Sequence, residues 1–423
     1  MTYALRAYRQ LLRLIIELVE IFPPRRVDRE EVDLRKGLYE PDVPIDQGVI
    51  WVHGASLGEV ITLRPLMRAL GARYGRNRLL ATATTFDGLR QIRRDGLATH
   101  ATLLPIEIPE LFGPFVDRMK PALVLISETE IWPLMAAQLA ARGIPCGIVN
   151  GRINPKTVRF AKLFSPLFRD SLQSLRFVFA QTPLFAARFH SLGIPSDRVE
   201  VLGSFKYDIE ETPVDQASLH NRYHIPVGRT VLTFGSTHEG EESVILDALE
   251  PLWKDMNATV VIAPRHLERL RDVEALLAAR HLDVTRLSEG SAPAGHLLLV
   301  DRLGELRNLF AISDLAYVGG SLIKRGGHNI LEPAACSLPI LSGPHLDNFV
   351  DEATALTNVK ALWIVSDVET LRKTIQAFLT DPAPFREGGT RANTVLRRLA
   401  GAGRRTLTRL DQRGLLPSWP YIS

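Results

Sequence analysis

Short apolar runs that alternate with helix-length segments recur along most of the chain and constrain its fold more than any other feature. Each run, such as Val49 to His53 or Leu315 to Val318, is followed by a helical segment of suitable length. Alternation of this kind is typical of a parallel sheet with helices on both faces. The strands expected in the first series are 49–53, 79–84, 101–104, 123–127, 144–149, 177–180 and 199–202. Those expected in the second are 231–234, 258–263, 284–287, 296–300, 315–318, 339–341 and 361–365.

The length and one polar segment predict two domains. A chain of 423 residues is too long for one ordinary core. Residues 210–217, EETPVDQA, have the polar and proline content of a linker. We therefore expect a Rossmann-like domain over residues 47–209, a linker over 210–218 and a second Rossmann-like domain over 219–423. Ligands of such sheets bind outside the carboxyl ends of the strands, so the two domains would face a central cleft.

Residues 1–22 predict an amphipathic helix. Three-and-four spacing places Leu5, Tyr8 and Leu12 on one face, whereas arginines and glutamates interrupt every apolar run. This pattern excludes a membrane-spanning helix and argues against a cleaved signal peptide. Two roles stay open, because such a helix can lie in a membrane interface or pack on the protein's own core. With the charged connector that follows, it forms a membrane-associating segment over residues 1–46.

Charge and cysteine content narrow the class of protein. The net charge of +4 and the pI of about 9.1 suit an anionic substrate or a membrane surface without requiring either. No basic tract is interleaved with aromatic residues, so no nucleic-acid partner is expected. Cys146 and Cys336 are far apart and lack a CxxC partner, which favours a reducing compartment over a disulfide framework. The histidines beside the motifs below fit no zinc spacing, and we assign no metal.

Residues 314–349, DLAYVGGSLIKRGGHNILEPAACSLPILSGPHLDNF, combine a strand, a glycine loop and a helix start. Backbone N–H groups of such a loop can approach a phosphate, and a helix N-terminus favours negative charge there. Asn329 stands where an N-cap belongs, and Glu332 follows three residues later, as in a capping box. The same pattern also occurs as a plain tight turn. The expected phosphate loop consists of Gly319, Gly320, Ser321, Gly326 and Gly327.

Polar side chains follow strands of the first series where ligands of a parallel sheet bind. Glu59 stands at a strand–loop–helix junction, Glu128 and Glu130 follow the strand 123–127, and Lys206 follows the last strand. A carboxylate at this edge can act as a general base. Each residue also has a structural interpretation: acids in a first helical turn stabilise the helix dipole, and a single lysine is usually solvated.

Six segments together resemble the signature of a glycosyltransferase family. They are WVHGASLGEV (51–60), SETEIWP (127–133), GSFKYD (203–208), APRHLER (263–269), LGE (303–305) and GGS…GGHN…EP…GP…NF (319–349). The family is that of the 3-deoxy-D-manno-octulosonic acid (Kdo) transferases of lipopolysaccharide synthesis. Its members have an α/β fold of the GT-B type and use CMP-Kdo and a lipid A precursor.

The resemblance implies roles for individual residues. Glu59 would be the general base of an inverting transfer from CMP-Kdo to lipid IVA, and Glu128 and Lys206 would stabilise developing charge. CMP-Kdo is then a substrate, and no cofactor is implied. The C-terminal helix, roughly Arg391 to Gln412, would cross back onto the first domain. The residues implied in CMP binding are Pro264, Arg265, Leu303, Gly304, Glu305, Asn329, Ile330, Leu331 and Glu332.

The resemblance also implies a peripheral position on the cytoplasmic face of the inner membrane, with a lipid A precursor as the second substrate. Two alternatives stay open. A sugar-nucleotide 2-epimerase shares the two-domain architecture but needs no lipid acceptor. A non-catalytic module that binds a nucleotide sugar or a membrane is the other alternative. Glu59, Glu128 and Lys206 together count against it, because a binding module has no use for a base.

Overall fold

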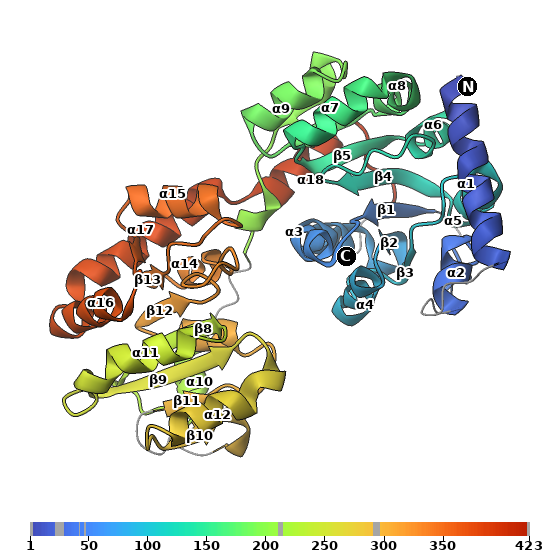
Figure 1. Cartoon of the computed structure of the whole chain (residues 1–423). Coiled ribbons are helices and arrows are strands. Elements are labelled where there is room, and N and C mark those ends of the chain that lie inside the picture. Colours follow the sequence, from blue (N-terminus) through green and yellow to red (C-terminus); the bar gives the residue numbers. More distant parts are fainter. Residues whose placement is uncertain are drawn as a thin grey trace. The chain divides into compact units, whose positions relative to one another are not determined.

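The computed structural model describes residues 3–21, 29–41, 43–45, 48–209, 215–290 and 297–420. It divides the chain into two compact units, each built on one seven-stranded parallel sheet (Figure 1). One unit comprises Met1–Asp208 and Leu399–Ser423, and the other comprises Ile209–Arg398. All fourteen expected strands are present, with boundaries that differ by at most three residues from the prediction. One expected strand start, His296, lies outside the described residues.

The first sheet has its topological switch between two central strands. From edge to edge its strands are β3 (His100–Leu103), β2 (Leu79–Ala83), β1 (Val49–His53), β4 (Pro121–Ser127), β5 (Cys146–Gly151), β6 (Phe177–Ala180) and β7 (Val199–Val201). The helices between them are α3 (Leu57–Tyr74), α4 (Phe86–Asp95), α5 (Pro109–Met119), α6 (Met135–Ala141), α7 (Pro155–Leu163), α8 (Ser165–Ser174) and α9 (Pro183–His190). β1 is buried along its whole length because helices cover both faces of the sheet. Ligands of such sheets bind at the switch, here outside the carboxyl ends of β1 and β4.

The second sheet also has its topological switch between two central strands. Its order is β10 (Val284–Arg286), β11 (Leu297–Leu299), β9 (Ala258–Pro264), β8 (Thr230–Thr237), β12 (Leu315–Val318), β13 (Ile340–Ser342) and β14 (Leu362–Ile364). Its helices are α10 (Gln216–Arg222), α11 (Glu241–Leu249), α12 (Leu270–Ala278), α13 (Leu306–Ala311), α14 (Leu331–Ala335), α15 (Val350–Asn358), α16 (Val368–Thr380) and α17 (Ala383–Leu399). The switch lies between β8 and β12, so the loops after these two strands form the expected ligand edge.

Three local expectations differ from the structure. Helix α2 (Arg29–Arg35) lies inside the expected connector, where Leu34 is buried against the first unit. Helix α10 begins at Gln216, inside the expected linker, and residues 210–214 lie outside the described part. The expected C-terminal helix is two helices, α17 and α18 (Ala402–Gln412), since Gly401 adopts a left-handed conformation with φ of 89°.

Helix α18 belongs to the first unit, where it packs against α3. Asp208, at the end of the first unit's N-terminal part, supplies its N-terminal cap. The Asp208 carboxylate accepts hydrogen bonds from the backbone N–H groups of Gly401, Ala402 and Gly403. Residues nearly two hundred positions apart in the chain are therefore joined at one helix end.

Helix α1 (Tyr3–Ile21) has two apolar sides. Leu5 is buried against the first unit, beside α8, whereas Leu11, Leu14 and Leu18 are exposed. Packing on the protein therefore leaves a second apolar surface uncovered. Among the described residues no helix is both long and apolar enough to cross a membrane.

Candidate functional site

Glu59 lies in the first turn of α3, after the carboxyl end of β1. Its carboxylate accepts hydrogen bonds from the Ala55 backbone N–H (3.0 Å) and the Ser56 hydroxyl (3.2 Å). Ser56 Oγ in turn accepts from the Glu59 backbone N–H, so Ser56 is the N-cap of α3. Burial nevertheless raises the pKa of Glu59, and these hydrogen bonds offset it only in part. A raised pKa suits a base that works near neutral pH.

Glu128 lies directly after β4, across the switch from β1. Its φ of 52° is unusual for a residue other than glycine, and its backbone N–H donates to the Val149 carbonyl (3.1 Å). Backbone strain of this kind is often found at functional sites. Burial and then the charge of Glu59 raise the pKa of Glu128, whereas the charges of Arg152 and Lys206 lower it. The structure thus brings Glu59, Glu128 and Lys206 together.

Glu130 belongs to the same group, although the resemblance implied no role for it. Burial, the charge of Glu59 and, less strongly, that of Glu128 raise the pKa of Glu130 to about 7. The nearby Trp132 side chain opposes that shift in part. A pKa of about 7 favours a bound proton on Glu130 below neutral pH.

Lys206 lies on a short 3-10 helix, Phe205–Tyr207, which a buried side chain anchors. Asn150 Oδ1, at the end of β5, accepts the Phe205 backbone N–H at 3.0 Å. The Asn150 carbonyl oxygen also accepts a hydrogen bond from Gln181 Nε2. Asn150 was not singled out in the sequence because its contacts are distant in the chain. Its φ of 52° sets it apart in the structure.

The backbone N–H groups of the expected phosphate loop donate hydrogen bonds to groups of the protein itself. The N–H groups of Gly320 and Ser321 donate to the Glu241 carboxylate at 2.7 and 3.0 Å. Those of Gly319 and Gly327 donate to backbone carbonyl groups. The expectation that these four amides bind a phosphate is therefore corrected. A Cβ atom at Gly319 would lie 2.3 Å from the Ser236 carbonyl oxygen, so this glycine permits a close backbone approach.

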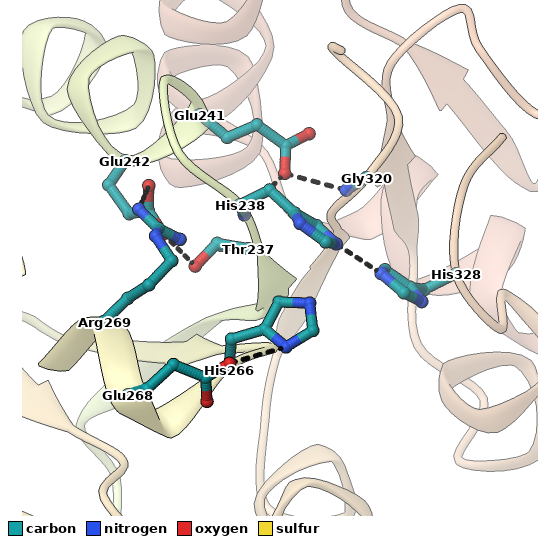
Figure 2. Close-up of polar contacts among 9 residues, drawn as sticks. All are labelled: Thr237, His238, Glu241, Glu242, His266, Glu268, Arg269, Gly320 and His328. Carbon is teal, nitrogen blue, oxygen red and sulfur yellow. Dashed lines mark hydrogen bonds and ion pairs between the residues drawn. The ribbon is translucent and has the colours of Figure 1, made fainter. Parts of the chain in front are cut away.

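The Glu241 carboxylate is the common acceptor of these loop hydrogen bonds (Figure 2). Its role was not predicted from the sequence. Its buried carboxylate also accepts hydrogen bonds from Tyr317 Oη and from the backbone N–H groups of His238 and Leu322. It fills the anion-binding position that a ligand phosphate would otherwise occupy. In the sequence, the segment GSTHEGEE (235–242) gives the signal for this role, because its acidic pair stands where α11 begins.

Three imidazoles line the same edge of the second sheet. His238 Nε2 lies 2.7 Å from His328 Nε2, with the two rings parallel and end to end, and the His266 ring lies edge-on to His238 (Figure 2). Burial and then the Arg265 charge lower the pKa of His328 to about 4. Within the described ranges, no three His, Cys, Asp or Glu side chains are grouped so that they could hold a metal ion.

The residues implied in CMP binding lie at this edge too. Pro264 ends β9 and Arg265 follows it, exposed. Leu303 is 73% exposed, whereas the Glu305 carboxylate binds Arg222 and Tyr223, both at 2.7 Å. Gly304 lies between them, with φ of 88°. The remaining residues, Asn329, Ile330, Leu331 and Glu332, surround the start of α14.

The N-cap of α14 differs from the expectation. The cap residue is Ile330, and Asn329 Oδ1 accepts the Leu331 backbone N–H (3.1 Å) while its Nδ2 donates to Glu332. Burial raises the pKa of Glu332, against that hydrogen bond and the charges of Arg307 and Arg265. The structure thus places Arg265 close to both His328 and Glu332.

Known proteins match this chain along most of its length. A sequence model of the 3-Deoxy-D-manno-octulosonic-acid transferase family (kdotransferase) matches residues 30–209. The 3-deoxy-D-manno-octulosonic acid transferase of Haemophilus influenzae is 31% identical over 405 residues, 94% of each chain. That of Bordetella pertussis is 32% identical over 404 residues, 93% of this chain and 92% of the other. The UDP-GlcNAc 2-epimerase from Neisseria meningitidis, solved with UDP-GlcNAc, shares the fold alone, at 15% identity and a TM-score of 0.58 over 86% of this chain and 100% of that one.

Two parallel α/β units, each with polar side chains grouped at its topological switch, define a fold of the GT-B type, which this chain shares with that epimerase. Identity above 30% along nearly the whole length then shows the particular family. The chain belongs to the Kdo transferases and is an enzyme of that family.

Proposed function

We propose that this enzyme transfers Kdo from CMP-Kdo to lipid IVA, a lipid A precursor, in lipopolysaccharide synthesis, with inversion at the anomeric carbon. The observation that carries the proposal is the grouping of Glu59, Glu128 and Lys206 at the switch of the first sheet in a Kdo transferase. Glu59 removes the proton of an acceptor hydroxyl. The freed oxygen bonds to the anomeric carbon as the bond from that carbon to the CMP phosphate oxygen breaks. Lys206 and Arg152 offset the negative charge beside Glu128.

CMP would bind the second unit. Arg265 and the exposed Arg325 supply positive charge for the phosphate, since most amides of the glycine loop are occupied. Glu332 accepts hydrogen bonds from ribose hydroxyls, and Leu303 covers the cytosine. Arg265→Ala should therefore weaken CMP binding in a calorimetric titration without lowering the melting temperature. Unchanged affinity would remove this edge as the donor site. Glu268→Ala, an exposed change three residues away, is the control.

The acceptor would lie in a membrane at the surface of the first unit. Helix α7 exposes Phe160 and Leu163, and Phe164 follows them. Between positions 152 and 169 the chain has five lysines and arginines and no acidic residue. Exposed apolar side chains among cations suit an anionic bilayer. With the exposed side of α1, this surface supports a peripheral position on the cytoplasmic face of the inner membrane.

Incubation of the enzyme with CMP-Kdo and lipid IVA tests the reaction, with the lipid product weighed by mass spectrometry. A mass gain of one or more Kdo units is expected, and the anomeric configuration of the product reports inversion. An isomer of the sugar nucleotide formed without lipid would support a 2-epimerase instead. CMP binding without any product would support a binding module.

A further inference from the structure

A buried carboxylate that has no part in the proposed reaction lies next to the loop that carries Glu128 and Glu130. Glu107, in the loop between β3 and α5, is 3% exposed. Its Oε2 accepts the backbone N–H groups of Leu134 and Met135, both at 2.8 Å. Its backbone carbonyl oxygen accepts Gln138 Nε2 at 2.6 Å. Burying a carboxylate costs free energy unless it is well hydrogen-bonded. Glu107 and the start of α6 therefore stabilise each other.

Helix α6 depends on this contact because its own sequence provides no cap. The N-cap residue is Leu134, which has no side-chain oxygen to bind the free amides of the first turn. Glu107, 27 residues earlier, supplies the missing acceptor. The start of α6 is also the end of the loop 128–134, so Glu107 fixes one end of the segment that presents both carboxylates.

The rest of that loop is held by other contacts. Val149 accepts the Glu128 backbone N–H, and Thr129 Oγ1 donates to the Arg152 carbonyl oxygen. Ser171 Oγ of α8 donates to the Trp132 carbonyl oxygen at 2.7 Å. These contacts come from neighbouring strands and helices of the first unit's body.

Glu107 differs because its other oxygen binds the N-terminal helix. Tyr8 of α1 donates its hydroxyl to Glu107 Oε1 at 2.8 Å. The same helix makes a second contact through Arg9 and Arg13, which both form ion pairs with Glu110. Glu110 lies at the surface and has no contact with α6 among those described, whereas Glu107 joins α1 and α6 directly.

We infer that Glu107 and Tyr8 are positioning residues for the transfer: they link the seating of α1 to the placement of Glu128 and Glu130. The inference rests on the proposed function. A shift of about 1 Å in a reacting group can cost about a hundredfold in rate. Helix α1 therefore helps to set the turnover, in addition to presenting an apolar surface to a membrane.

Tyr8→Phe removes one hydroxyl and tests the link with lipid IVA dispersed in detergent, where membrane binding has no part. We expect kcat to fall about tenfold, because the loop loses one restraint, while KM for CMP-Kdo is unchanged. Glu107→Gln should also lower kcat. The double variant should be no slower than Glu107→Gln alone, since both changes break one linkage. Glu110→Gln, which frees the same helix at its surface contact, should leave kcat unchanged.

Hydrogen exchange gives a readout that needs no activity. The amides of residues 128–140 should exchange faster in Tyr8→Phe and Glu107→Gln than in wild type, and at the wild-type rate in Glu110→Gln. Unchanged kcat and unchanged exchange in Tyr8→Phe would overturn the inference, as would equal effects of Tyr8→Phe and Glu110→Gln. A wild-type enzyme that forms no Kdo-lipid would overturn the proposed function, and the exchange comparison would still decide whether the linkage exists.

Discussion

Glu59 uses one carboxylate for two purposes. It caps α3 through the amide of Ala55 and the hydroxyl of Ser56, and it lies beside the carboxylates after β4. A helix N-terminus favours the ionised form of an acid, whereas burial favours the neutral form. Burial is the stronger effect here, because the pKa of Glu59 is raised. The structural interpretation of Glu59 and the catalytic one are therefore compatible.

Glu59→Gln separates these two purposes. The glutamine oxygen can still accept the Ala55 amide, but the side chain can no longer take a proton from the acceptor. Turnover should fall by about 10²–10⁴, the usual cost of losing a general base, with CMP affinity and melting temperature near wild type. Steady-state kinetics and calorimetry measure these quantities. Undiminished transfer would exclude Glu59 as the base and leave Glu128 as the better candidate.

The proton on Glu130 predicts a pH dependence of stability. Its pKa of about 7 exceeds the ordinary value of 4.5, so the folded protein binds more protons than the unfolded chain between these values. The free energy of unfolding should therefore fall as pH rises from about 4.5 to 7. Glu107, whose pKa burial also raises to about 7, contributes in the same direction. Glu130→Gln should make the fall smaller in urea titrations across this range, and an identical slope would contradict the assignment.

At the scale of elements, patterns within one segment were predictable and contacts between segments were not. Buried strands such as Val49–His53 are uninterrupted apolar runs, and their places in the sequence were visible. The glycine loop after β12 was also visible. However, a strand, glycines and a helix start have the same sequence pattern whether a phosphate or an internal carboxylate binds the amides. Glu241 and Glu107 were missed for that reason: their partners lie up to 81 and 99 residues away in the chain.

Helix α7 carries the prediction that belongs to this scale. Phe160→Ser with Leu163→Ser removes two exposed apolar side chains, of which Leu163 is 76% exposed. Binding to phosphatidylglycerol-containing vesicles should fall about a hundredfold or more, since each apolar side chain inserted into a bilayer contributes about 1.5–3 kcal/mol. Flotation of vesicles measures the bound fraction. Val227→Ser, an equally exposed position in the second unit, is the matched control, and equal losses in both would exclude α7 as the membrane-facing surface.

At the scale of the whole molecule, the chain enters the second unit after Asp208 and returns to the first at Leu399. Hydrogen bonds from the first amides of α18 to the Asp208 carboxylate hold the returning segment on the first unit. Asp208→Ala should lower the free energy of unfolding by about 1–2 kcal/mol, the cost of losing an N-cap. It should also speed tryptic cleavage near Arg397 and Arg404. Asp367→Ala, which removes the cap of α16 in the second unit, should lower stability without exposing those sites. Unchanged cleavage in Asp208→Ala would show that α18 is held by packing alone.

The return of the chain also sets an order of events during synthesis. The ribosome makes residues 399–420 after the whole of the second unit has been translated. When residue 398 has been made, all strands of the second unit have been translated, whereas the amides that Asp208 caps have not. A translation stop after residue 398 would therefore leave a finished second unit attached to a first unit that lacks its final helix.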